Sequence, residues 1–327
     1  MTLDPELAGL THHVAQAGSV AELLSDPSGQ QRLEAFCGGL IPYAAPDVPV
    51  RAMQVPGPHG PVPIRIYGEG SGGGTLGGAR GGGAPALVWM HGGNFAVGGL
   101  DMRESDQLGR EVAARSGGVV VSVGYRLALD GVHFPVPHED VLAAWFWISE
   151  HAGRLGLDPS RLCLGGASAG GNLAVGAALY LKDSGRTLPA KLVLAYPFLH
   201  GELPFAGDPV LPLMAEIPPF LSFTGEDCRS MVENYIGGPL LMASSYAMPG
   251  HADPAGLPSA AVLACECDNL RFSAELFVEG LRAEGIPVDY RLEPGTTHGF
   301  LNHSAALNVV QRGLQFLADQ LKPPHPN

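Results

Sequence analysis

From residue 86 onward, short apolar runs with the length of buried strands alternate with longer segments of helical periodicity. Parallel strands need a crossover between them, usually a helix, and a sheet built in this way is buried on both faces. The alternation predicts an α/β fold, with a mostly parallel eight-stranded sheet covered by helices on both faces and its chemistry at the carboxyl ends of the strands. We expect strands at 51–55, 62–67, 86–90, 119–123, 161–164, 191–195, 260–264 and 288–292, and helices at 104–115, 140–155, 172–181, 272–284 and 307–321.

One serine lies where a strand is expected to turn sharply into a helix. The segment from Gly166 to Gly170 has the form G-x-S-x-G with Ser168 at its centre, and it follows the apolar run 161–164. The helix 172–181 comes next, so the motif has the strand, turn and helix that its mechanism requires. Such a turn lifts the hydroxyl out of the sheet, and the glycines allow close approach of neighbouring backbone. Ser168 is therefore the candidate nucleophile.

A serine hydroxyl needs a base to take its proton, and the base needs an acid to orient it. Asp268 and His298 each follow one of the expected strands in the last third of the chain, which delivers both to the active edge of the sheet. The order Ser168, Asp268, His298 is the one that accompanies this type of nucleophile turn. Glu266 and Glu293 are competing acids. Because Glu266 is expected to point along its strand, we favour Asp268.

Backbone donors for a developing oxyanion are expected beside the serine. The segment from His91 to Asn94 reads His-Gly-Gly-Asn and follows the strand 86–90, where one half of an oxyanion hole should lie. The N–H groups of Gly93, Asn94 and Ala169 are predicted to converge on the alkoxide oxygen.

Four motifs hold these reacting groups, and a fifth follows the strand 119–123. They are His91-Gly92-Gly93-Asn94, Gly166 to Gly171, Asp268-Asn269-Leu270-Arg271 and His298-Gly299-Phe300, with Tyr125-Arg126-Leu127-Ala128 as the fifth. In this combination, over residues 85–320, the chain resembles the hormone-sensitive-lipase-like (bacterial family IV) esterases of the α/β-hydrolase superfamily.

The resemblance implies the α/β-hydrolase fold with a helical cap, and it implies roles for the residues already singled out. Ser168 would be the nucleophile, His298 the general base and Asp268 the orienting acid, with the oxyanion hole at Gly93, Asn94 and Ala169. It further implies a serine carboxylesterase that hydrolyses short- to medium-chain acyl esters through an acyl-enzyme, without a cofactor.

The same resemblance divides the chain into a core and a cap. Residues 1–45 would supply N-terminal cap helices, residues 46–199 and 251–327 the α/β-hydrolase core, and the proline-rich segment 200–250 a second part of the cap. We expect this cap to lie over the strand ends.

Four positions depart from the family pattern. Asn94 replaces the last glycine of a His-Gly-Gly-Gly sequence, and asparagine tolerates a left-handed backbone while keeping its N–H. Ala167 and Gly124 replace aspartates common before the nucleophile and before Tyr125, and Leu129 stands where proline is usual.

Two further segments resemble ligand sites only formally. Gly68-x-Gly70-x-x-Gly73 has the spacing of a dinucleotide motif but opens no helix and lies in a glycine-rich insert, 68–83, that is expected to be a loop. Cys265-Glu266-Cys267 has no second Cys/His pair at ligand spacing, so we assign it to core packing. The sequence therefore predicts neither a cofactor nor a metal.

The composition narrows the partners. The 327 residues are 46% hydrophobic and 16% charged, with a net charge of −13, which argues against nucleic acid or a stable membrane association. Five scattered cysteines fit a reduced compartment. With no basic, apolar leader at the start of the sequence, we expect a cytoplasmic protein that acts on a small-molecule ester, with a homodimer as a further expectation.

Three functions compete on this scaffold. The leading one is ester hydrolysis. The alternative is a lyase or dehydratase that uses His298 as base and holds an enolate in the oxyanion hole, with Asn94 as a substrate contact. A binding protein without catalysis is disfavoured because Ser168, Asp268 and His298 are all retained.

Overall fold

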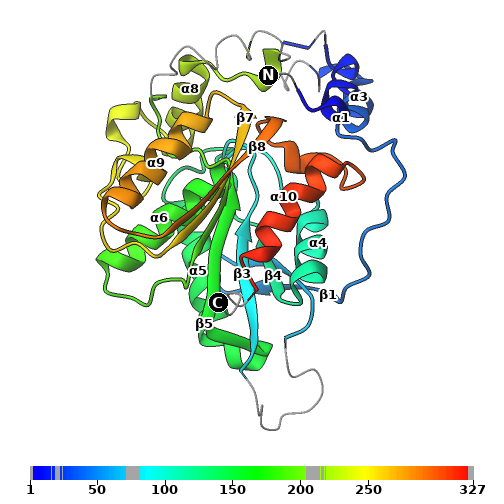
Figure 1. The fold of residues 1–327 in the computed structure, drawn as a ribbon. Coiled ribbons are helices and arrows are strands. Elements are labelled where there is room, and N and C mark those ends of the chain that lie inside the picture. Colours follow the sequence, from blue (N-terminus) through cyan, green and yellow to red (C-terminus); the bar gives the residue numbers. More distant parts are fainter. Residues whose placement is uncertain are drawn as a thin grey trace.

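The computed structural model describes residues 3–15, 17–18, 23, 25–70, 82–203, 214, 217 and 219–322. Within these residues lies one twisted sheet with helices on both sides (Figure 1). Its strands are β1 (Val50–Val55), β2 (Val62–Tyr67), β3 (Ala84–Met90), β4 (Val119–Val123), β5 (Leu157–Ala167), β6 (Leu192–Ala195), β7 (Ala260–Cys267) and β8 (Val288–Thr297).

The strand order across the sheet is β1-β2-β4-β3-β5-β6-β7-β8. The first two strands form a hairpin that is antiparallel to β4, and every pair from β4 to β8 is parallel. The prediction of a mostly parallel eight-stranded sheet is confirmed.

Along the sequence, the helices lie before β1, between successive strands from β3 to β8, and after β8. The α-helices are α1 (Pro5–Ala8), α3 (Gly29–Phe36), α4 (Asp106–Ser116), α5 (Val136–Glu150), α6 (Ala169–Asp183), α8 (Gly225–Ile236), α9 (Arg271–Ala283) and α10 (Asn308–Asp319). Short 3₁₀ turns are η1 (Thr11–His13), η2 (Ala152–Leu155), η3 (Pro219–Leu221), η4 (Leu240–Met242), η5 (Pro249–His251) and η6 (Phe300–Asn302).

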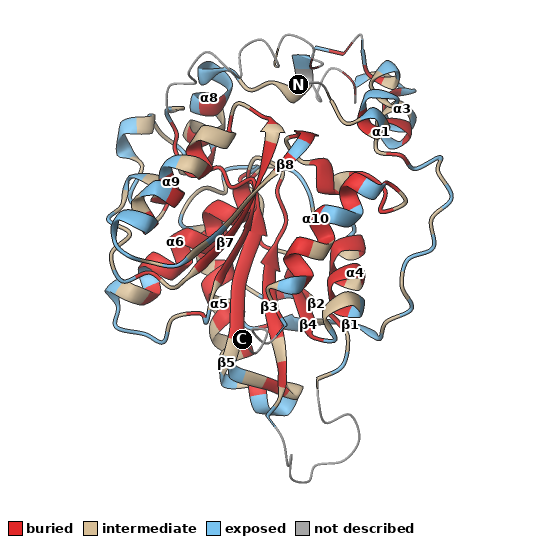
Figure 2. Cartoon of the chain, viewed as in Figure 1, coloured by how far each residue is buried: buried red, intermediate tan, exposed pale blue. Residues whose placement is uncertain are grey.

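Both faces of the sheet are covered. Successive strand residues point to opposite faces, and those of β3 divide accordingly. Val88 and Met90 belong to the cluster formed with α5, α6 and α9, whereas Leu87 and Trp89 belong to the cluster formed with α4 and α10. All four side chains are fully buried, as the red strands in Figure 2 illustrate. This two-sided burial explains why the strands read as continuous apolar runs.

Several elements extend beyond their expected bounds, among them β5, β8 and α5. β5 runs on to Ala167, directly before Ser168. β8 continues past residue 292 to Thr297, which pairs with Cys267 of β7 after a shift in register. α5 begins at Val136, before the expected residue 140. Pro137 fits in its first turn because the N–H that proline lacks would make no helical hydrogen bond there.

Two segments lie beyond the carboxyl ends of the strands, where Figure 1 shows α1 and α3 on one side and α8 on the other. A small apolar cluster joins them, since Leu221 packs against a group of buried residues that includes Val14 and Phe36. Most of the glycine-rich insert (71–81) and residues 204–213 lie outside the described residues.

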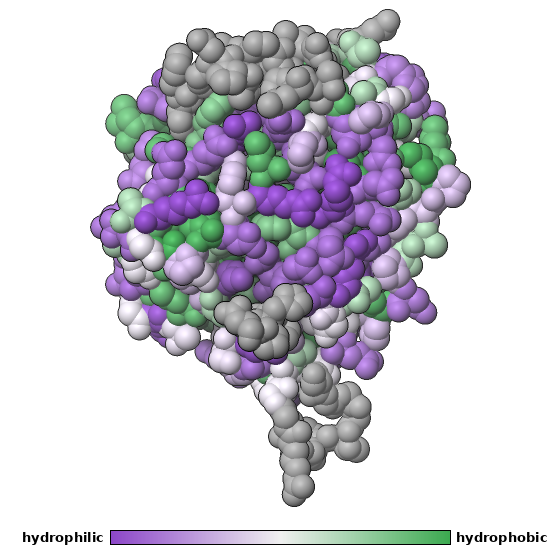
Figure 3. Space-filling view, in the orientation of Figure 1, coloured by the Kyte–Doolittle hydropathy of each residue, from purple (hydrophilic) through white to green (hydrophobic). Residues whose placement is uncertain are grey.

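No helix among the described residues combines the length and apolar character needed to cross a bilayer. The face drawn in Figure 3 carries a broad band of hydrophilic residues, with apolar ones scattered around it.

Candidate active site

Ser168 lies at the turn between β5 and α6. Its φ of 51° and ψ of −116° fall in a region that a residue with a side chain rarely adopts, so the surrounding packing must hold the turn. A Cβ at Gly166 would lie 2.3 Å from the carbonyl carbon of Gly170, which shows how closely the strand end and the helix start approach. The Ser168 N–H donates to the Ala195 carbonyl at 2.9 Å and so fixes the turn to β6.

The structure brings the three predicted side chains together. Nε2 of His298 lies 2.8 Å from Oγ of Ser168, and Nδ1 lies 2.7 Å from Oδ2 of Asp268. The second oxygen of Asp268 accepts the N–H of Leu270 at 2.9 Å. Because Nδ1 can donate to the carboxylate, Nε2 is left to accept the serine proton. This arrangement can activate a hydroxyl nucleophile.

The two competing acids are engaged elsewhere. Oε2 of Glu266 accepts the N–H of Gly295 at 2.9 Å, and Oε1 of Glu293 accepts Nε of Arg312 at 2.6 Å. Asp268, which is fully buried, is the acid hydrogen-bonded to His298.

Two aromatic rings confine the imidazole of His298. Tyr196, which follows β6, meets it edge-on with ring centroids 5.0 Å apart, and Phe223 meets it edge-on at 5.1 Å. Phe223 precedes α8, and its N–H donates to Oδ1 of Asn269 at 3.2 Å. The segment before α8 is thereby tied to the residue that follows Asp268.

The predicted oxyanion segment follows β3 and has an unusual backbone. Gly93, Asn94 and Phe95 have φ values of 106°, 54° and 63°. The Gly93 carbonyl accepts the N–H groups of Ala96 and Val97 at 3.0 and 2.9 Å, which closes a tight turn. The left-handed φ expected for Asn94 is therefore present.

Ala169 is the first residue of α6, so its N–H has no acceptor within the helix. Within the described parts of the chain, the N–H groups of Gly93 and Asn94 also donate to no backbone acceptor. The placement of these three N–H groups around an oxyanion beside Ser168 stays a prediction.

Of the three remaining departures from the family pattern, those at Gly124 and Ala167 lie in tightly packed surroundings. A Cβ at Gly124 would lie 3.0 Å from Cγ of Pro63 and 3.3 Å from Cγ of Leu100, which fill the space of a larger side chain. Ala167 is fully buried in the cluster formed with α4 and α10. Leu129 is 47% exposed, and nothing in the structure explains why it replaces proline.

Comparison with known proteins agrees with this geometry. A family described as having the alpha/beta hydrolase fold matches residues 87–302. Carboxylesterase NlhH of Mycobacterium tuberculosis is 34% identical over 243 residues, which cover 71% of this chain and 73% of the relative. The chain belongs to the hormone-sensitive-lipase-like esterases of the α/β-hydrolase superfamily.

Other similar proteins support the same assignment for this esterase. An ethyl acetate hydrolase of Pseudomonas putida is 30% identical over 282 residues, covering 80% of this chain and 78% of the relative. A hyperthermophilic esterase from the archaeon Pyrobaculum calidifontis superimposes with a TM-score of 0.80 at 28% identity, covering 98% of each chain. The chain is a carboxylic-ester hydrolase, and the lyase alternative is not favoured.

Sequence reasoning missed two buried polar residues of the esterase site. Glu104 was expected only as the start of a helix, yet its carboxylate accepts the hydroxyl of Tyr196 at 2.6 Å and the N–H of Gly92 at 2.7 Å. Tyr196, directly after the expected strand 191–195, was given no role. A single sequence carries no signal for either contact, because the partners lie far apart along the chain.

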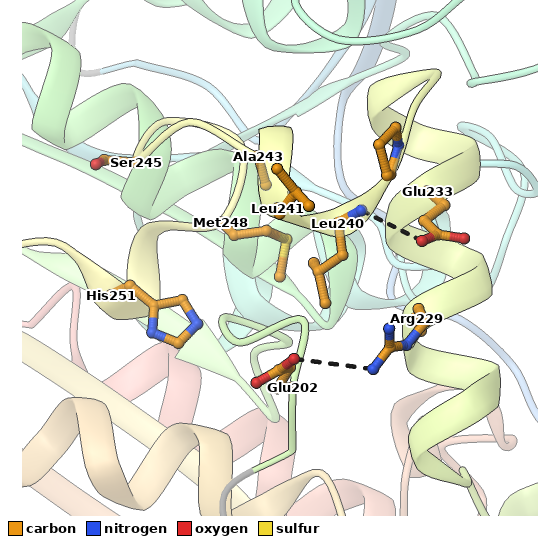
Figure 4. A pocket seen from close by; sticks show the side chains of 10 residues that line it. Glu202, Arg229, Glu233, Leu240, Leu241, Ala243, Ser245, Met248 and His251 are labelled. Carbon is orange, nitrogen blue, oxygen red and sulfur yellow. Dashed lines mark hydrogen bonds and ion pairs between the residues drawn. The ribbon is translucent and has the colours of Figure 1, made fainter.

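A separate cavity of about 510 Å³ lies between α8 and the turns η4 and η5 (Figure 4). Leu240 and Met248 contribute apolar surface, and Arg229 faces Glu202 across it at 3.8 Å. Ser168, Asp268 and His298 do not line this cavity. Its lining residues, from Glu202 to His251, belong almost entirely to the expected cap segment 200–250.

Proposed function

We propose that Ser168, His298 and Asp268 form the catalytic triad of this esterase. Oγ of Ser168 attacks the ester carbonyl while Nε2 of His298 takes its proton, and the imidazolium then gives that proton to the leaving alcohol. Water attacks the resulting acyl-enzyme in the same way, which releases the acid and restores the hydroxyl. The hydrogen bonds at 2.8 and 2.7 Å that link the three side chains are the observation that carries this proposal.

The N–H groups of Gly93, Asn94 and Ala169 are proposed to stabilise the tetrahedral oxyanion. The tight turn at Gly93 and the position of Ala169 at the start of α6 support this role. The positive end of the helix dipole acts in the same direction. Each such donor contributes about 3 kcal/mol to transition-state stabilisation.

We assign residues 1–45 and 200–250 to a cap and the rest to the core. The packing of Leu221 against the cluster that contains Val14 and Phe36 supports a cap built from both segments. Contact between Phe223 and His298 supports its position over the site. Short- to medium-chain acyl esters are the proposed substrates, since one relative is named an ethyl acetate hydrolase and others are named acetyl esterases.

A serine-specific test follows. Ser168→Ala should lower kcat for 4-nitrophenyl butyrate by at least about 10⁴-fold, because it removes the attacking atom. Ser184→Ala is the matched control, since Ser184 lies beyond the other end of α6, where its hydroxyl donates to the Tyr180 carbonyl. A fluorophosphonate should add its phosphonyl group to the peptide that contains Ser168. Hydrolysis by Ser168→Ala at the wild-type rate would refute the triad.

Two expectations about the whole protein also remain proposals. A cytoplasmic location is supported by the five cysteines, all of which are free. A homodimer is supported by β8, which is an edge strand of the described sheet and could pair with a second copy. Cell fractionation and light scattering after size-exclusion chromatography test these two proposals.

A further inference from the structure

Glu104 is a buried carboxylate with three hydrogen-bond donors aimed at it. Its side chain belongs to a residue that is 1% exposed. Oε2 accepts the Gly92 N–H at 2.7 Å, and Oε1 accepts the Tyr196 hydroxyl at 2.6 Å and Nδ2 of Asn302 at 3.1 Å. The backbone carbonyl of Glu104 also accepts Nε1 of Trp89 at 2.8 Å, which anchors the segment against β3.

These donors come from three separate parts of the active site. Gly92 directly precedes Gly93 of the oxyanion segment. Tyr196 follows β6 and presents its ring edge to His298. Asn302 ends η6, four residues after His298. One carboxylate therefore ties the oxyanion segment to both sides of the general base.

Charge as well as geometry couples Glu104 to the base. Burial is the largest influence and raises the pKa of Glu104 above its ordinary value, while its hydrogen bonds and the nearby charge of His298 act in the opposite direction. Two of its donors, a backbone N–H and an amide NH₂, carry protons that only an acceptor oxygen can satisfy, which favours the ionised form. Tyr196 and Tyr125 also face this carboxylate, while Asp268 and Glu104 are the acids that face His298.

We propose that Glu104 is a positioning residue of this esterase: as a carboxylate it holds the oxyanion segment in register with His298 and stabilises the imidazolium that forms when Ser168 attacks. The inference rests on the triad proposed above. It adds to that triad a second buried acid, which lies behind the reacting atoms and touches no substrate.

Two variants separate charge from shape. Glu104→Gln keeps the side-chain volume and can keep its oxygen toward the Gly92 N–H, while its NH₂ donates to the Tyr196 oxygen and Asn302 has to turn its amide to present Oδ1. We expect kcat to fall roughly 10-fold with little change in KM, because the oxyanion segment keeps its acceptor but the imidazolium loses its anion. Glu104→Ala frees the segment as well, and a misplacement of about 1 Å costs about 100-fold.

The pH profile distinguishes this role from a purely structural one. An anion near the imidazole favours its protonated form, so Glu104→Gln should move the acidic limb of the kcat/KM profile to lower pH than in the wild type. A loss of stability alone would lower the number of active molecules without shifting the acidic limb of the kcat/KM profile. The concentration of active sites is therefore measured by labelling with a fluorophosphonate, and rates are expressed per active site.

Glu111→Gln is the matched control. Glu111 is a buried carboxylate one and a half turns into α4, and its partners are Tyr43 and Arg115 rather than active-site residues. It should keep both the wild-type kcat and the wild-type pH profile. An inactive Ser168→Ala together with a Glu104→Gln variant of wild-type kcat and unchanged profile would overturn the role of Glu104 and leave the triad intact. An active Ser168→Ala would instead refute the triad itself.

Discussion

Oδ2 of Asp268 lies 2.7 Å from Nδ1 of His298, and the two side chains are 0% and 8% exposed. They emerge from neighbouring strands, since Cys267 and Thr297, which directly precede them, are paired across β7 and β8. Because the pair is shielded from water, the carboxylate can both hold the imidazole tautomer and stabilise its protonated form.

Asp268→Asn should therefore reduce kcat by about 10³- to 10⁴-fold, since an amide cannot stabilise the imidazolium and can present the wrong hydrogen-bonding group to Nδ1. Glu266→Gln is the comparison, because Glu266 accepts a backbone N–H from Gly295 instead of contacting His298. The kcat of Glu266→Gln should fall by less than about 10-fold. Steady-state kinetics on 4-nitrophenyl butyrate measures both. A larger loss in Glu266→Gln than in Asp268→Asn would reverse the assignment of the acid.

The backbone of Asn94 predicts an unusual order of stabilities. At a φ of 54°, glycine fits without strain, asparagine is tolerated and alanine is strained by about 1–2 kcal/mol. Asn94→Gly should match or exceed the wild-type free energy of unfolding, and Asn94→Ala should fall below it. Urea unfolding gives the order. Asn94→Gly should also keep its activity, because the backbone donor is unchanged, so an inactive variant would point to a role for the amide side chain.

The positions of the strands and the meeting of Ser168, Asp268 and His298 could be predicted because both depend on local patterns. Apolar runs mark the strands, and Asp268 and His298 are reactive side chains directly beyond two of them. The end of β8 was not predictable in this way, since Glu293, Pro294 and Gly295 interrupt the apolar pattern and only pairing with β7 extends the strand to Thr297.

Other parts of the site depend on contacts between distant segments. Glu104 acquires its role only when residues 92, 196 and 302 meet around it. The helix α8 was overlooked although it has a local signal, since Thr224 and Asp227 form a capping box at its start. The proline-rich sequence before it obscured that signal.

Buried neutral histidines predict a loss of stability in mild acid. Burial lowers the pKa of His200 and of His303 to about 4, against 6.5 for an exposed histidine. Below pH 6.5 the unfolded chain therefore binds protons that the folded chain does not, so stability falls as the pH drops from 6.5 toward 4. Each histidine should remove about 2 kcal/mol between pH 7 and pH 5.

Urea unfolding at the two pH values tests this loss. His303→Gln should lose about 2 kcal/mol less free energy of unfolding between pH 7 and pH 5 than the wild type. Glutamine can still donate to the Phe300 carbonyl, which Nδ1 of His303 approaches at 3.2 Å, so the variant should fold. An unaltered slope in His303→Gln would show that this histidine does not contribute.

A close backbone approach at the nucleophile turn predicts that Gly166 cannot be replaced without strain. A Cβ at Gly166 would lie 2.3 Å from the Gly170 carbonyl carbon, and that atom belongs to backbone that cannot rotate away. Gly166→Ala should lower the free energy of unfolding by about 1–3 kcal/mol. It should also lower kcat, because α6 must shift and Ser168 moves with it. Gly153→Ala is the control, since a Cβ there meets nothing within 4 Å. If both variants unfold at the same urea concentration as the wild type, the turn is looser than its geometry indicates.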